Sequence, residues 1–222
     1  INSNPLYINK FITETIKIYQ SFGYNNTKIS YNTILDKSSN TIDIAFDIIE
    51  GDITKINRIH FKGNTVSESN LLSNIKSKTK SLRNIFANNN FKLFTVKNDV
   101  RNLINYYKDE GYRDIDIDYQ IEYLNSDKVN IYFIINEGKL YNFAQIDILD
   151  RDSIVNENVI NIINNQINLF LEENITFSRV KTNKLKKNIA TNLKANGINY
   201  FELRVLEKIN QNNVNLLYEI NS

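Results

Sequence analysis

Apolar and polar residues alternate strictly along the segment Asp114–Tyr123. Ile115, Ile117, Tyr119, Ile121 and Tyr123 take one set of positions, and Asp114, Asp116, Asp118, Gln120 and Glu122 take the other. A period of two predicts a β-strand with one buried face. After a turn at Asn125–Lys128, the segment Val129–Gly138 is apolar on both faces. We therefore expect a hairpin whose second strand is central in a sheet and whose first strand lies at the edge.

Two helices and one more strand are predicted upstream of this hairpin. In Val96–Gly111 the apolar residues recur at i, i+3, i+4 and i+7, which is typical of an amphipathic helix, and Gly111 is suited to end it. Ser67–Ser77 predicts a shorter helix, and Ile56–Asn64 a strand that ends in a Gly-Asn turn. Ser81–Phe94 has no period and is interpreted as a long loop. The element order is therefore β-α-α-β-β.

This unit is repeated along the chain. The Glu50-Gly51 pair recurs as Glu137-Gly138, a spacing of 87 residues from Gly51 to Gly138, and a third copy of the strand before it runs to Ser222. A fixed period of this length indicates a supersecondary unit used several times. We predict a partial module at 1–51, a complete module at 52–138 and another module at 139–222.

The flanking modules follow the same plan. In the last module we predict strands at Phe143–Leu149, Tyr200–Leu206 and Val214–Ile220, and helices near Ile154–Ile167 and at Arg179–Ala195. The first one predicts a helix over residues 9–22 and a hairpin of Lys28–Ile34 with Thr41–Ile49.

The fold class is α+β: tandem β-α-α-β-β modules, each a three-stranded mixed sheet covered on one face by two antiparallel helices. The first strand of each module should lie parallel to the third, which is central. Because almost no linker separates one module from the next, we expect hinges at Glu50 and Gly51 and at Glu137 and Gly138. We also expect the ring of Tyr112, after the glycine that ends the helix, to pack back on the core.

Composition excludes several kinds of chemistry. The 222 residues carry a net charge of +2, contain no cysteine, and include one histidine. That excludes a zinc cluster of histidines and cysteines and a cysteine nucleophile, and it disfavours nucleic-acid binding. We predict no enzyme activity, no catalytic residue, no metal and no cofactor. His60 is interpreted as a surface residue and Tyr106-Tyr107 as one boundary and one core aromatic. Alternate acids on a strand lie about 7 Å apart, too far to wrap a calcium ion.

Several spaced motifs carry a family resemblance: the Gly-Asn pair after the first strand, "YYKDEGY" at the end of the second helix, and the Glu-Gly pair that closes the third strand. With these motifs the chain resembles the POTRA domains of bacterial outer-membrane protein assembly factors, as part of a second domain followed by a third and fourth. The last module departs from the pattern at Leu149–Asp152 and at Gly197-Ile198.

The resemblance implies a periplasmic segment of an outer-membrane protein, which meets the membrane only through a barrel outside this segment. Its implied partners are unfolded outer-membrane proteins and accessory lipoproteins of the assembly complex, bound by strand addition at an exposed sheet edge. The alternatives are a two-partner secretion or TamA-like transporter, or an envelope scaffold outside any channel. The candidate partner-binding residues are Asp114, Ile115, Asp116, Ile117, Asp118, Tyr119, Gln120 and Ile121.

Overall fold

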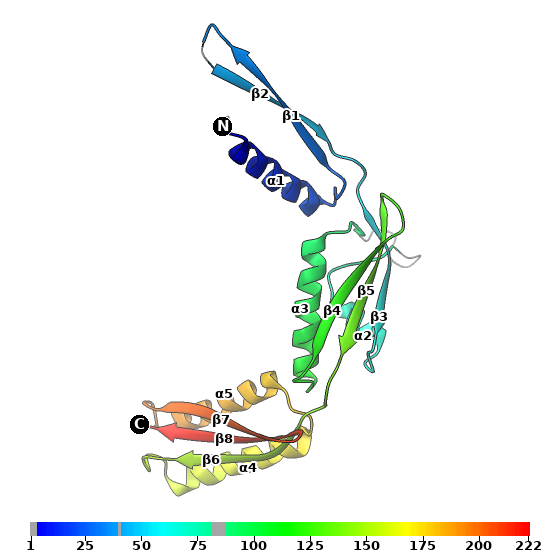
Figure 1. Ribbon diagram of the computed structural model, residues 1–222. Helices are drawn as coiled ribbons and strands as arrows, with labels where there is room; N and C mark the ends of the chain where they lie inside the picture. The colour runs from blue at the N-terminus through cyan, green and yellow to red at the C-terminus, as the bar shows by residue number, and fades with distance from the viewer. Residues whose placement is uncertain (1–3, 40, 81–87) are drawn as a thin grey trace. The chain divides into compact units, whose positions relative to one another are not determined.

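The computed structural model describes residues 4–39, 41–80 and 88–222. The chain divides into two compact units, which are described separately below. One contains residues 1–103 and 117–135, and the other contains residues 104–116 and 136–222. The end of the long helix of the middle module therefore belongs to the same unit as the last module (Figure 1). The module boundaries at 51 and 138 stay a prediction.

The amino-terminal part of the first unit is a helix and a hairpin. Asn4 caps the helix by accepting the N–H of Leu6 at 3.0 Å, and Pro5 takes the first helical position, so the helix begins before residue 9, where the sequence had placed it. In the described part of residues 1–50, Ile8 is the only apolar side chain in the core. So small a core is what we expect of a half-module. The elements are α1 (Pro5–Phe22), β1 (Lys28–Asp36) and β2 (Thr41–Ile49).

The middle module has the predicted strand order. The sheet runs β3-β5-β4, and β3 lies parallel to β5 (Figure 1). The central position of β5 fits its burial, because Val129, Ile131 and Phe133 are fully inaccessible to solvent. The elements are β3 (Lys55–Lys62), α2 (Glu68–Ser73), α3 (Leu93–Asp109), β4 (Asp116–Tyr123) and β5 (Lys128–Asn136).

The first helix of this module is shorter than Ser67–Ser77, and a buried carboxylate on α3 explains why. The side chain of Asp99 accepts the backbone N–H of Lys76 at 2.6 Å and that of Ser77 at 2.9 Å. These bonds draw the chain away from helical geometry after Ser73. The loop predicted at Ser81–Phe94 lies partly outside the described residues, and its last two residues already belong to α3.

The last module repeats the middle one with a longer first helix, 17 residues in α4 against 6 in α2. Its sheet runs β6-β8-β7, again with the first strand parallel to the central one. The register between parallel strands shifts after Ile56 in the middle module and after Phe143 in this one, which are 87 residues apart. The elements are β6 (Asn142–Asp150), α4 (Glu157–Glu173), α5 (Arg179–Ala195), β7 (Glu202–Asn210) and β8 (Asn213–Asn221).

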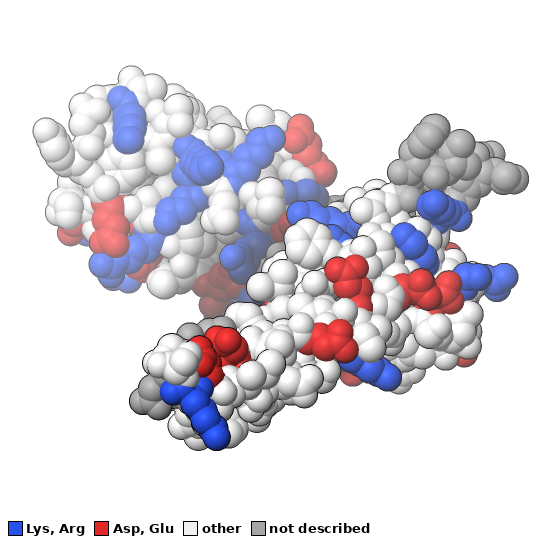
Figure 2. All heavy atoms as spheres, turned by 90° about the horizontal axis from the view of Figure 1, so that it is seen from above, with Lys and Arg blue, Asp and Glu red and all other residues white. Residues whose placement is uncertain are grey.

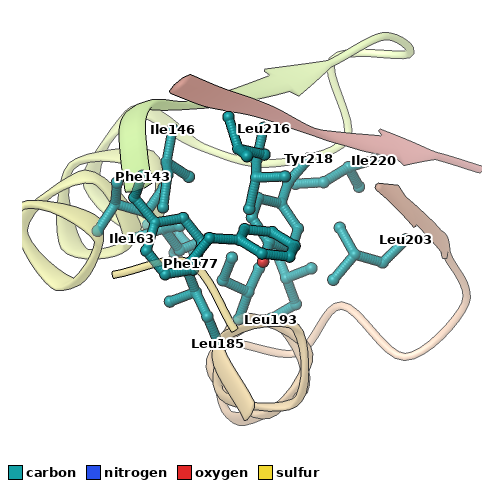
Figure 3. Packing of buried hydrophobic residues seen from close by; sticks show 14 of the residues in the cluster. Phe143, Ile146, Ile163, Phe177, Leu185, Leu193, Leu203, Leu216, Tyr218 and Ile220 are labelled. Atoms are coloured by element: carbon teal, nitrogen blue, oxygen red, sulfur yellow. The ribbon is translucent and has the colours of Figure 1, made fainter. Parts of the chain in front are cut away.

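The helix predicted near Ile154–Ile167 is displaced toward the carboxyl end. It begins after Asn156, whose side chain accepts the N–H of Val159 at 3.0 Å, and it continues to Glu173. Side chains from both helices meet those of the sheet in one core (Figure 3). Ile163 and Leu185 come from the helices, and Phe143 and Leu216 from the strands. Each module therefore closes its core on one face of its sheet.

Candidate binding edge and module corners

The predicted edge strand lies at the edge of the middle sheet. Among the described residues, β5 is the only strand that pairs with β4. Ile117 is buried, Tyr119 and Ile121 are half-buried, and the acids between them are exposed, so the alternation read from the sequence is confirmed. One side of the strand backbone remains available to another chain.

Two hydrogen bonds identify which backbone groups point away from β5. In the hairpin, the N–H of Leu124 donates to the carbonyl of Lys128 at 2.9 Å, so the even-numbered residues of β4 face the ladder. The N–H of Tyr119 donates to the carboxylate of Asp118 at 2.8 Å, a bond that lies outside the ladder. The outward groups are therefore those of Ile117, Tyr119 and Ile121. Asp118 covers the middle one.

This assignment decides where proline can remove an outward N–H. Asp116 and Asp118 are not such positions. Both residues have even numbers, so their N–H groups face β5. Tyr119 is the position at which proline removes a donor from the free side of the strand.

Two of the predicted binding residues lie before the strand. β4 begins at Asp116, so Asp114 and Ile115 belong to the corner that follows α3. The carboxylate of Asp114 accepts a hydrogen bond from the Tyr141 hydroxyl at 2.8 Å, and Ile115 is buried. These two residues hold the corner, whereas Asp116, Ile117, Asp118, Tyr119, Gln120 and Ile121 form the edge.

The open face of the same sheet carries a polar cluster that the sequence reasoning did not assemble. His60 stacks on Tyr132 with ring centroids 4.7 Å apart, and the ammonium of Lys62 lies 4.6 Å from the same ring. Glu122 accepts hydrogen bonds from Asn130 and from the Tyr132 hydroxyl, and these bonds lower the pKa of its carboxyl. His60 is thus a surface residue with an ordered partner. The position of His60 directly opposite Tyr132 on the neighbouring strand is the feature that could have predicted this contact.

The two predicted hinges differ in what surrounds them. Gly51 and Gly138 both have positive φ, 73° and 67°. Glu50 is exposed, whereas Glu137 is buried and accepts a hydrogen bond from the Tyr107 hydroxyl at 2.9 Å. Burial, and then this bond, raise the pKa of Tyr107, so the phenol stays protonated and donates. Glu137 therefore ties the end of β5 to α3.

Each of the two long helices that precede a module ends in a corner with the same backbone bonds. At the first corner (Gly23, Asn25, Thr54 and Phe91), the carbonyl of Gly23 accepts the N–H of Thr54 at 2.9 Å, and the carbonyl of Thr54 accepts the N–H of Phe91 at 2.8 Å. All four residues lie in the first compact unit. The side chain of Asn25 donates to the carbonyls of Gly23 and Phe91 at 2.9 and 3.1 Å.

The second corner (Gly111, Arg113, Tyr141, Phe177 and Glu207) lies wholly in the second unit. The carbonyl of Gly111 accepts the N–H of Tyr141, and the carbonyl of Tyr141 accepts the N–H of Phe177, both at 2.9 Å. Here an arginine takes the place of the asparagine. The guanidinium of Arg113 lies 4.7 Å from the centre of the Phe177 ring and 2.8 Å from the carboxylate of Glu207.

The aromatic residues beside this corner follow the sequence expectations. Tyr107 is fully buried and Tyr106 is half-buried, as predicted for a core and a boundary aromatic. The ring of Tyr112 is half-buried and meets that of Tyr107 edge to face, with centroids 5.4 Å apart. Tyr112 therefore packs back on the helix end as expected. Its partial exposure lowers the energy that this packing contributes.

Other chemistry is sparse in the residues that the structure describes. In that part of the chain, no group of three or more histidine, aspartate or glutamate side chains could hold a metal ion, and none of the helices is long and apolar enough to cross a membrane. The face shown in Figure 2 carries both acidic and basic side chains.

Comparison with known proteins agrees with this architecture. Residues 54–138 match the POTRA family model, described as a surface antigen variable number repeat. The chain is 28% identical, over 142 residues, to the outer membrane protein assembly factor BamA of Neorickettsia risticii. That alignment covers 63% of this chain and 19% of the relative, so the chain spans about a fifth of the length of the curated relative it matches.

Two solved structures are among those that align with this chain. POTRA domains 3–5 of Haemophilus influenzae BamA align with a TM-score of 0.40 and 14% identity, over 97% of this chain and 80% of that one. POTRA domains 1–2 of Omp85 from Anabaena align with a TM-score of 0.45 and 9% identity, over 76% of this chain and 94% of that one. The assignment rests on the sequence match and on the β-α-α-β-β order. Residues 54–138 match the POTRA family model, and the sheet order β6-β8-β7 repeats the order β3-β5-β4.

Proposed function

We propose that this chain is a periplasmic binding scaffold in an outer-membrane protein assembly factor, and that β4 receives unfolded outer-membrane proteins by strand addition. The observation that carries the proposal is the free side of β4, where the N–H of Tyr119 is bonded to the side chain of Asp118 instead of to a strand. The similarity to an outer membrane protein assembly factor supports the cellular role. Accessory lipoproteins are a second class of partner for the same scaffold.

The free side of β4 offers a short ladder to an extended guest. The guest carbonyls would accept the N–H groups of Ile117, Tyr119 and Ile121, and the guest N–H groups would donate to the carbonyls of the same residues. These bonds place little demand on the guest sequence, which suits a scaffold that meets many different chains. The buried side chain of Ile117 keeps the strand in place while a guest pairs with it.

The exposed acids set the charge preference of the edge. Asp116, Asp118 and Glu122 present carboxylates on the open face of the strand. A guest with acids at the facing positions would be repelled, whereas a guest with basic or neutral residues would be accepted. The hinges at Glu50 and Gly51 and at Glu137 and Gly138 would let a bound segment be presented in more than one direction. The glycines, rather than the buried Glu137, would take up the rotation.

Strand addition is tested with the pair Tyr119→Pro and Tyr119→Val. Both variants truncate the same half-buried ring, but only proline removes the outward N–H. A photoreactive residue at the exposed Gln120 position should crosslink to a urea-denatured outer-membrane protein in the valine variant and lose most of that crosslink in the proline variant. Circular dichroism checks that both fold. Equal crosslinking by two folded variants would place the binding surface elsewhere.

A further inference from the structure

We propose that the groove between α4 and α5 of the last module docks an acidic amphipathic helix of a partner protein. This surface is separate from the edge of β4 and recognises a different kind of guest. The groove has a volume of about 340 Å³ and lies within the second compact unit. Its lining residues are Gln166, Leu169, Phe170, Glu173, Asn174, Lys181, Lys184, Leu185 and Asn188.

On the α4 side, Leu169 and Phe170 are the apolar residues that line the groove. Ile162, which is not a lining residue, lies seven residues before Leu169 on the same stripe of the helix, beside the stripe that enters the core. Ile162 and Leu169 are 48% and 60% exposed. Ile163 and Ile167 already fill the core, so the outer pair is not needed to close the module. Two large apolar side chains on one stripe are the anchors that a packed helix requires.

The α5 side of the groove is basic. This helix carries six basic residues and no acidic one, while α4 carries three acidic residues and no basic one. Lys181 and Lys184 line the groove, and within the described residues neither forms an ion pair. A cross-helix hydrogen bond from Asn192 to Gln166, at 2.6 Å, holds the two helices together beside the groove.

These features specify one occupant. A third helix fits a groove between two antiparallel helices, with apolar residues at i, i+3 or i+4, and i+7 facing the groove. Its carboxylates should lie along α5, beside Lys181 and Lys184, and its uncharged flank along α4, where Glu173 would repel an acid. An extended strand would leave its backbone groups unpaired here, because helices offer no free ladder.

The proposal is tested with the whole 222-residue chain and a labelled helical peptide. The peptide carries leucines on one stripe and glutamates on one flank, and fluorescence anisotropy measures its binding. We expect the double variant Lys181→Glu/Lys184→Glu to weaken binding about tenfold. The matched control, Lys187→Glu/Lys194→Glu, makes the same change in net charge on an exposed face of the same helix and should change binding less than about twofold.

Three further measurements decide the outcome. Leu169→Ala should weaken peptide binding while leaving the thermal unfolding midpoint unchanged, because this side chain lies outside the core. A scrambled peptide of the same composition should not bind. Equal weakening by both charge-reversed pairs, or binding of the chain to phosphatidylglycerol vesicles without binding of the peptide, would overturn the proposal in favour of a general attraction of α5 for anions.

Discussion

The two corners of the chain have the same backbone bonds and different side chains. In both, a glycine carbonyl accepts an N–H at the start of the following strand region, and a second bond ties that region to the loop before the second helix of the module. At the first corner the remaining space is filled by Asn25, which bridges two carbonyls. At the second it is filled by Arg113, between an aromatic ring and a carboxylate. The repeat therefore conserves the backbone connection, and the side chains set how strongly each corner is held.

The largest difference in stability between the two corners should appear when the glycine at each corner is replaced by alanine. At Gly111, with φ of 98°, a Cβ would lie 2.5 Å from Cγ2 of Thr176 and 3.1 Å from the backbone oxygen of Phe177. We expect Gly111→Ala to cost about 3 kcal/mol of unfolding free energy, from strain and overlap together. At Gly23 a Cβ would lie 3.1 Å from a side-chain methyl of Ile53, and we expect about 2 kcal/mol.

Gly197 is the control for this pair. It has φ of 86° and ends α5 with the same helix-terminal hydrogen bonds, but a Cβ there would have no neighbour within 4 Å. Gly197→Ala should therefore cost only the backbone strain, about 1 kcal/mol. Denaturant unfolding of the three variants measures the order of their losses in unfolding free energy. Equal losses at Gly111 and Gly197 would mean that crowding at the second corner does not destabilise the variant.

A smaller loss is expected for Tyr112→Ala. The half-buried ring packs edge to face on Tyr107, so its removal should cost about 2 kcal/mol, less than the 3 kcal/mol or more for a fully buried aromatic. The thermal unfolding midpoint measures the loss. The corresponding variant at the first corner, Tyr24→Ala, removes a ring 6.0 Å from Tyr19 and provides the comparison. An unchanged midpoint for Tyr112→Ala would mean that this ring does not stabilise the corner.

Arg113→Lys should distinguish the contribution of guanidinium stacking from the contribution of the positive charge. A lysine can keep the ion pair with Glu207, but it stacks less well on the Phe177 ring. We expect Arg113→Lys to cost about 0.5 kcal/mol and Arg113→Ala about 1 kcal/mol, because both partners of the ion pair are partly exposed. Unfolding at low and high salt makes the distinction, since salt should reduce the loss in the alanine variant. A loss that is independent of salt would assign the whole effect to stacking.

Asn25→Ala tests the polar corner. It removes two hydrogen bonds to backbone carbonyls at a half-buried position and should cost about 1 kcal/mol. The effect should be local, so hydrogen exchange should accelerate at the amides of Thr54 and Phe91, which complete the corner bonds. Unchanged exchange there would show that the backbone bonds hold without the asparagine.

Local patterns predicted much of this fold because the responsible interactions are close in sequence. The alternation in Asp114–Tyr123 and the apolar run after Lys128 were enough to place β4 at the edge and β5 in the centre. The starts predicted for α1 and α4 were wrong, although Asn4-Pro5 and Asn156 are ordinary capping signals for the true starts.

Contacts between distant residues could not be read in this way. Asp99 meets Lys76 and Ser77 only once α3 has folded against the end of α2, and no local signal marks that carboxylate as buried. The position of Arg113 beside Phe177 likewise depends on two connecting segments, one after α3 and one before α5, that meet in space. The direction of the N–H of Tyr119 required the hairpin register, which the sequence did not supply.

The carboxylate of Asp118 gives the edge of β4 a built-in competitor. Because it is attached to the residue next to the donor, its effective concentration at the N–H of Tyr119 does not depend on how much guest is present. Under the proposed strand addition, every guest would have to displace this carboxylate, so every guest would bind more weakly by the same factor. Two copies of the chain that met edge to edge would have to displace it twice, which disfavours self-association. In that role the edge would favour turnover, in which captured chains are released before they become permanent strands of the sheet.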